Sequence, residues 1–227
     1  MWLVLLITLA APSPPPSNWV DGGLTLGALA GWAGLDAAHA HWVDPSCPCT
    51  PPQVNALERP VVHFDVDGAE AAADGLTAAL MVGAVAVPLF LADGGAHWRD
   101  ALLVVEAMAM AGLLTQVAKT TFGRPYPYMN GPAPYQEQNA DGVNYASFWS
   151  GHTAVPMAGV VAAAQLYGAR RPKSALARWL IWVGPTLALV AGGLQIAASN
   201  HYPSDVVVGG LVGFGVGVAV PGLRGAL

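Results

Sequence analysis

The chain reads FWSGHT at residues 148–153, where a long segment rich in Gly, Pro, Asn and Tyr gives way to an apolar run. A Ser-Gly-His triplet at such a junction predicts a helix start with a chemical use. Ser150 can cap the helix, and Gly151 lets a ligand approach the backbone. The unpaired N–H groups of a first helical turn suit an anion, and His152 beside them can transfer a proton.

The composition is typical of a membrane protein. Of 227 residues, 54% are hydrophobic and only 10% are charged, whereas soluble domains average about 25% charged residues. Gly and Ala are abundant, as expected where helices pack closely in lipid. The chain has no basic patch, which argues against a nucleic-acid partner. A soluble protein with an unusually apolar core is the alternative, and the length of the apolar runs argues against it.

Six apolar segments follow the N-terminus, and none of them shows the alternation of a strand. They are residues 22–38, 74–91, 100–120, 153–167, 177–199 and 206–220. Several reach the roughly 20 residues that cross a hydrocarbon core. The first is the weakest, because it is short and carries Asp36. We therefore predict an all-α fold, a six-helix bundle in the membrane.

The cations lie mainly in alternate connections between these segments. They are Arg99, Arg170, Arg171, Lys173, Arg178 and Arg224. By the positive-inside rule they mark the cytoplasmic face. The SGH stretch and the HYPSD stretch at 201–205 are then expected together on the extracytoplasmic face. In a bacterial-type cell this predicts an inner-membrane protein with its site towards the periplasm.

Residues 1–17 resemble a signal peptide without a positive n-region. Its cleavage would reverse every later helix if 22–38 spans the membrane, so either that segment does not span or the N-terminal run is uncleaved. We expect the first helix and an extracytoplasmic loop within 18–72, and a catalytic core at 73–222. The loop holds Cys47 and Cys49, and we favour a local feature, a disulfide or free thiols over a zinc site there.

Other polar and aromatic residues receive structural interpretations. Residues 122–149 form a long connection, for which a lid and a structural Ω-like loop are equally open. Glu106 is expected to be a hydrogen-bonded residue of the bundle rather than a proton relay. Packing or surface roles are expected for His39, His41, His63 and His97. Interface anchoring is expected for Trp42, Trp98 and Trp179.

Three pieces of sequence meet on the extracytoplasmic face of this topology. Lys119 ends the third segment and Arg124 lies just beyond it, the SGH triplet opens the fourth, and HYPSD precedes the sixth. The four-residue spacing of His201 and Asp205 can bring a carboxylate to an imidazole N–H and leave the other ring nitrogen free to attack.

These residues support phosphoryl transfer to a histidine. His201 would attack phosphorus, Asp205 would orient it, and His152 would donate a proton to the leaving oxygen. The phosphate oxygens would be held by Lys119, Arg124, Ser150 and Gly151. This chemistry requires no metal or other cofactor.

The three pieces resemble the motifs of the type 2 phosphatidic acid phosphatase (PAP2) superfamily, which also includes the vanadium haloperoxidases. The family motifs are K-x6-R-P, P-S-G-H and S-R-x5-H-x3-D, and their order and spacing fit over residues 74–220. The resemblance implies a PAP2-type helix bundle, a nucleophile at His201 and an acid at His152. It also implies phosphate binding by Lys119, by Ser150 and Gly151, and by the basic positions of the first and third motifs.

The chain departs from these motifs at four places. Tyr126 occupies the first-motif Arg position, with Arg124 two residues earlier, and Trp149 replaces the Pro of the second motif. Leu194 and Gln195 replace the Ser-Arg pair, so Gln195 is expected to bind phosphate without a charge. Each donor aimed at developing charge is worth about 3 kcal/mol in a transition state, so two missing cations predict weaker catalysis.

We predict a membrane phosphatase that hydrolyses a phosphate monoester or pyrophosphate through a phosphohistidine. The substrate is expected to be a phosphorylated lipid, with a small phosphate ester as the other option. The alternative is a degenerate relative that binds phosphorylated lipid with weak or no catalysis, and a vanadate-dependent peroxidase comes third. Tyr126 and Gln195 favour the alternative, whereas intact His152, His201 and Asp205 favour the phosphatase.

Overall fold

The computed structural model describes residues 18–43, 55–91, 97–130 and 141–227. These residues form long α-helices joined by short 3-10 helices and irregular segments, without a strand among them. The α-helices are α1 (Asn18–Trp42), α2 (Ala69–Leu91), α3 (His97–Phe122), α5 (Gly151–Arg170), α6 (Ala175–Ala197) and α7 (Pro203–Leu223). The 3-10 helices are η2 (Arg59–His63), η3 (Pro127–Asn130) and η4 (Gly142–Asn144). The predicted all-α bundle of six helices is confirmed.

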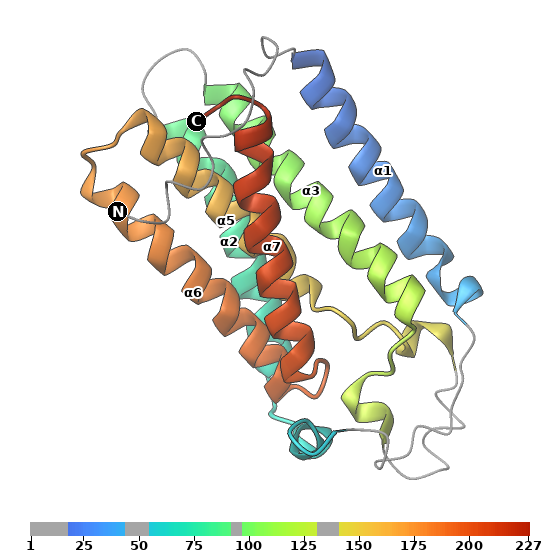
Figure 1. Cartoon of the computed structure of the whole chain (residues 1–227). Coiled ribbons are helices and arrows are strands. Elements are labelled where there is room, and N and C mark those ends of the chain that lie inside the picture. Colours follow the sequence, from blue (N-terminus) through green and yellow to red (C-terminus); the bar gives the residue numbers. More distant parts are fainter. Residues whose placement is uncertain (1–17, 44–54, 92–96, 131–140) are drawn as a thin grey trace.

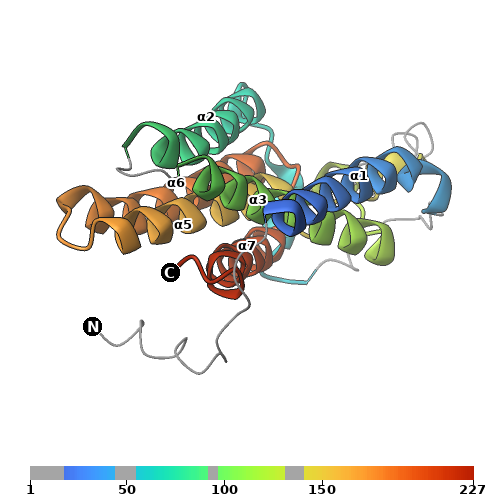
Figure 2. The same cartoon turned by 90° about the horizontal axis from the view of Figure 1, so that it is seen from above.

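Helix α5 is the centre of the bundle (Figure 1). Nearly all of its residues between Thr153 and Tyr167 are buried. The helices α2, α3, α6 and α7 all contact it, and α1 packs on the outer side of α3. The view from above shows α2 and α7 on opposite sides of α5 (Figure 2). The SGH triplet therefore opens the one helix that every inner helix touches.

The four helices that surround α5 have the length and composition of membrane spans. Four segments of the described residues qualify, namely Ala69–Leu91, Trp98–Asn130, Ala175–Ala197 and Pro203–Leu223. Their outward side chains are large and apolar, and Phe90, Trp182 and Leu211 are each at least 70% exposed. A helix surface of this kind is stable against lipid tails rather than water. Residues 1–17 and the two cysteines, for which we made predictions, lie outside the described residues.

Helices α5 and α7 approach closely along a row of glycines. A Cβ on Gly209 would lie 2.6 Å from the carbonyl oxygen of Ser150, and one on Gly217 would lie 2.7 Å from that of Ala158. Gly213, between them, is closer still to the carbonyl oxygen of Ala154. Small residues at every fourth position let two helix backbones meet. This contact fixes the start of α7 beside the start of α5.

Ion pairs close the end of the bundle where α3 begins. Arg99 contacts Asp21 of α1 at 3.1 Å, and Arg170 binds Asp100 through two hydrogen bonds of 2.5 and 2.7 Å. Arg224 donates to Glu106 at 2.6 Å, which confirms the expectation that Glu106 is a bonded residue of the bundle. The cations that we assigned to one face therefore lie at the end opposite to the SGH triplet.

The residues that we expected to be structural behave so where they are described. His39 is buried and hydrogen-bonded to Thr120 at 3.2 Å, and His41 is exposed. Trp42, Trp98 and Trp179 are all exposed near helix ends. Such positions suit the aromatic belts at membrane boundaries.

Candidate active site

The site forms where α3 and α6 end and where α5 and α7 begin. The backbone N–H of Ser150 donates to the carbonyl oxygen of Asp205 at 3.1 Å, which ties the two helix starts together. The N–H of Ser147 donates to the carbonyl of Arg124 at 3.0 Å, which ties the connection to the end of α3. The structure thus brings together the three pieces of sequence that the predicted topology placed on one face.

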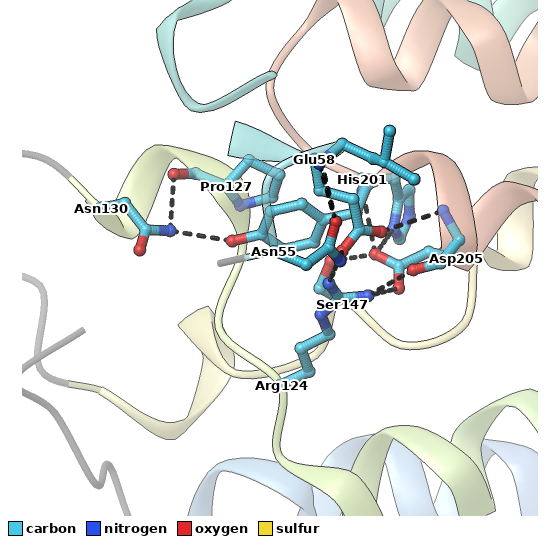
Figure 3. A network of polar contacts seen from close by, with 11 residues as sticks. Asn55, Glu58, Arg124, Pro127, Asn130, Ser147, His201 and Asp205 are labelled. Atoms are coloured by element: carbon cyan, nitrogen blue, oxygen red, sulfur yellow. Dashed lines mark hydrogen bonds and ion pairs between the residues drawn. The ribbon is translucent and has the colours of Figure 1, made fainter. Parts of the chain in front are cut away.

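Asp205 lies at the centre of a buried polar network (Figure 3). Its Oδ1 accepts a hydrogen bond from Arg124 at 2.5 Å. Its Oδ2 accepts from the Ser147 hydroxyl at 2.5 Å and from the backbone N–H of Tyr202 at 2.9 Å. The bond to Tyr202 closes the first turn of α7. This helix begins at Pro203, and proline is well tolerated at a first helical position. A carboxylate held by this many donors has a fixed orientation.

Arg124 directs its guanidinium at carboxylates. Besides Asp205 it contacts Glu58 at 2.8 Å, donates to the Ser204 hydroxyl at 2.8 Å, and lies 3.9 Å over the ring of Tyr202. Asn55 in turn donates to Glu58 (Figure 3). We expected Arg124 to bind phosphate, but in this structure its donors are engaged by Asp205 and Glu58.

His201 is almost completely buried, with 2% of its surface exposed. Its Nδ1 lies 3.7 Å from Oδ2 of Asp205, which is beyond hydrogen-bond distance. Burial lowers the pKa of His201, and the carboxylate of Asp205 opposes this shift. The imidazole is therefore held neutral near pH 7, as a nucleophile requires. Hydrogen bonds of catalytic groups often tighten only when substrate is bound.

His152 lies in the first turn of α5, within reach of His201. The two ring centroids are 6.4 Å apart. Its Nε2 lies 2.9 Å from Oδ1 of Asp74, a residue of α2. The pKa of His152 lies below its ordinary value, because burial lowers it more than the carboxylate of Asp74 raises it. The two histidines thus lie close enough to act on opposite sides of one small reacting group.

Ser150 and Gly151 occupy the helix start, but one expectation about them is wrong. Ser150 is the N-cap residue, yet its side chain makes no capping hydrogen bond. Its hydroxyl is buried and accepts from the Thr153 hydroxyl at 3.2 Å instead. The first N–H groups of α5 consequently lack a side-chain cap and keep their capacity to bind an anion.

A cavity of about 640 Å³ opens beside this helix start. Lys119, Gly151 and His152 line it together with Asp36, Thr77, Thr115 and Gln116. The rest of its wall is apolar and comes mainly from α1 and α2, through Leu29, Trp32, Ala33, Met81 and Val155. The ammonium group of Lys119 has no hydrogen-bond or ion-pair partner among the described residues. An unpartnered cation at the polar end of an apolar cavity suits an amphiphilic anion.

The two positions at which the family motifs have Arg, here Tyr126 and Gln195, have distinct surroundings. Tyr126 packs edge-on against the ring of His201, at 5.9 Å between centroids, and stacks on Tyr128. Gln195 is 1% exposed, and its Oε1 accepts from Asn200 at 2.9 Å. Its Nε2 has no partner among the described residues. A buried unsatisfied donor is unfavourable, so this amide is available for an anionic ligand.

Sequence reasoning missed three polar residues of the site, namely Glu58, Asp74 and Ser147. Glu58 and Asp74 precede the motifs, and no spacing rule connects them to His152 or Asp205. The signal that could have identified them is their charge, because acidic residues are rare in membrane-embedded chains and tend to be functional.

Comparisons with known proteins agree with the family that the motifs resemble. Residues 100–226 match the PAP2 superfamily, so the chain belongs to that superfamily. It is also 33% identical over 118 residues to a protein of Porphyromonas gingivalis named lipid A 1-phosphatase. That alignment covers 51% of this chain and 22% of the relative, so the chain spans about a fifth of the relative's length. No solved structure matches the chain.

Proposed function

We propose that the protein is a membrane phosphatase that removes phosphate from a phosphorylated lipid through a phosphohistidine on His201. The observation that carries the proposal is the cavity in which Lys119, Gly151 and His152 share one wall with apolar side chains. A phosphate at the polar end would meet Lys119 and the first turn of α5. An alkyl chain would lie against the residues of α1 and α2.

The first half of the reaction would join His201 to phosphorus. Because Nδ1 of His201 faces Asp205, Nε2 is the nitrogen that attacks. The bond from phosphorus to the lipid oxygen breaks, and that oxygen takes a proton from the His152 imidazolium. Asp205 stabilises the positive charge that develops on His201. The products are a free lipid alcohol, or a lipid monophosphate when the substrate is a pyrophosphate, and phosphorylated His201.

The second half would release phosphate with water. His152, now neutral, accepts a proton from a water molecule while the oxygen of that water attacks phosphorus. The bond between His201 and phosphorus breaks, and both histidines return to their starting states. Lys119, the N–H groups of α5 and the free amide of Gln195 would hold the equatorial oxygens during both steps.

The end of the bundle that holds the candidate active site would face away from the cytoplasm. The cations Arg99, Arg170 and Arg224 lie at the opposite end of the bundle, beside Asp21, Asp100 and Glu106. The short connections there carry the remaining basic residues of the set assigned to the cytoplasm. This supports an inner membrane location with the active site on the periplasmic side.

The alternative is a phosphorylated-lipid binder with little catalysis, and a specific observation favours it. Arg124 is occupied by two carboxylates, and a neutral Gln195 stands where the resemblance implies a cation. Lys119 is the one cation among the described residues that line the cavity. The two functions differ in turnover rather than in binding.

Phosphate release by the purified protein in detergent micelles distinguishes them. We expect release from dioctanoyl phosphatidic acid or from a lipid pyrophosphate, and much less from glycerol 3-phosphate, which has no chain. His201→Ala should abolish release, whereas His41→Ala, at an exposed histidine on α1, should not. If wild-type protein and His201→Ala release phosphate equally, the phosphatase is ruled out. Retained binding of phosphatidic acid in that case supports the alternative.

A further inference from the structure

Asp74 contacts the proposed acid from outside the region that matches the family. Oδ1 of Asp74 lies 2.9 Å from Nε2 of His152, although the residues are 78 positions apart in the chain. Helix α2 makes a second contact one turn further on, where the Thr77 hydroxyl lies 3.4 Å from the carbonyl oxygen of His152. The family match begins only at residue 100, so both contacts come from a part of the chain that it does not cover.

We propose that Asp74 is a positioning residue for His152: it holds the imidazole through Nε2, and its negative charge favours the protonated form that a proton donor needs. This inference rests on the proposed phosphatase function. With Nε2–H bonded to Asp74, the nitrogen left for the substrate is Nδ1. Nδ1 has no hydrogen-bond partner among the described residues. The leaving oxygen would thus receive its proton from Nδ1.

The charges around His152 show why such a partner is needed. From α3, Lys119 disfavours a second positive charge on His152, and the ring that faces His152 from the segment before α7, His201, is held neutral. Burial of His152 acts in the same direction on its pKa. Two carboxylates of α2 oppose these effects, Asp74 by direct contact and Glu70 from a greater distance. Asp36 of α1 lines the same cavity.

The exposure of the pair makes a clean test feasible. The side chain of Asp74 is 59% exposed and that of His152 is 37% exposed. Ion pairs this accessible to solvent contribute little to folding stability. Asp74→Asn keeps an oxygen that accepts the hydrogen bond and removes only the charge. Glu70→Gln, one turn earlier on the same helix, removes an exposed charge without removing a contact to His152, and is the matched control.

The first readout is the pH dependence of kcat/KM for phosphate release. An adjacent charge shifts a pKa by about 1 unit or more. In Asp74→Asn we therefore expect the basic limb to move about one unit towards acid, with rates near the acid optimum changed less than about threefold. At pH values above the basic limbs of both the wild-type protein and the variant, this shift corresponds to a loss of about tenfold in kcat/KM. A uniform loss at all pH values, an unmoved limb, or an equal shift in Glu70→Gln would overturn the inference.

The second readout does not depend on turnover. Diethylpyrocarbonate reacts with neutral imidazole, and mass spectrometry of the peptide that contains His152 follows its modification as a function of pH. We expect Asp74→Asn to shift this titration towards acid by about the same one unit. If the wild-type protein is active but Asp74→Asn does not shift the modification of His152, the proposed role of Asp74 is overturned. An inactive wild-type protein that shows the shift overturns the proposed function and leaves the contact between Asp74 and His152 intact.

Discussion

Arg124 is expected to affect the chemical step rather than the binding of phosphate. Its guanidinium lies 2.5 Å from Asp205 and 2.8 Å from Glu58, and the Asp205 side chain is fully buried. Removal of one partner from a buried ion pair costs about 3–5 kcal/mol. Because the side chain of Arg124 is 26% exposed, we expect the lower end of that range, about 3 kcal/mol. Part of this loss falls on the orientation of His201 by Asp205.

Arg124→Lys tests this assignment because it keeps the charge but loses the planar fork that reaches both carboxylates. We expect kcat to fall about tenfold or more, which corresponds to about 1.4 kcal/mol or more of transition-state stabilisation. Inhibition by orthovanadate, a mimic of the transferred phosphoryl group, should change less than about twofold. Lys119→Gln should show the opposite pattern, with vanadate inhibition weakened about tenfold or more.

The thermal denaturation midpoint in detergent separates this effect from misfolding. Glu58→Gln removes the second carboxylate charge on Arg124, and we expect it to lower kcat and the midpoint while leaving vanadate inhibition unchanged. The reasoning is refuted if Arg124→Lys weakens vanadate inhibition as much as Lys119→Gln does and leaves kcat intact. Arg124 would then bind phosphate, as its position in the sequence predicts.

Three further predictions concern pH, packing and charge. Because burial lowers the pKa of His201 from its ordinary value of about 6.5, the unfolded chain binds a proton first as the pH falls. The stability that neutral His201 contributes is therefore fully present above about pH 6.5, and it is lost as the pH falls through the folded-state pKa. His201→Gln removes this titration, so the denaturation midpoint should fall less between pH 7 and pH 5 than in the wild-type protein. Gly213→Ala should destabilise the protein by about 1–3 kcal/mol through its clash with α5, whereas Gly215→Ala, which meets nothing within 4 Å, should not, as denaturation midpoints will show. Gln195→Arg should strengthen vanadate inhibition about tenfold if a missing charge limits phosphate binding, and Gln195→Met should not.

The fold was predictable because hydropathy and charge act over whole helices. Every predicted apolar segment coincides with a helix to within a few residues at its ends, and α7 begins at Pro203, a residue that suits a first helical turn. The excess of cations at alternate connections correctly placed Arg99 and Arg224 at one end. These signals sum over about twenty residues, so no single contact can reverse them.

The positions of the histidines were predictable for a different reason. His201 and Asp205 are only four residues apart in the sequence. The backbone N–H of Tyr202 donates to Asp205 at the start of α7, and this bond holds the carboxylate near His201. The partner of Arg124 was not predictable in this way. Which anion a guanidinium binds depends on the nearest carboxylate in space, and Glu58 comes from an irregular segment without periodicity.

Because Arg124 forms ion pairs with Glu58 and Asp205, other groups have to bind the phosphate of a substrate. The phosphate of the proposed substrate would meet Lys119 and the N-terminus of α5, which line the cavity. One charged donor aimed at the transition state is worth about 3 kcal/mol. Burial of ~100 Å² of alkyl chain against the apolar wall of the cavity supplies about 2.5 kcal/mol. Burial of its alkyl chain can therefore offset most of the free energy that a lipid substrate loses through one missing cation. A small soluble ester has no alkyl chain and cannot offset this loss. The departures at Tyr126 and Gln195 thus weigh against a soluble substrate more than against a lipid.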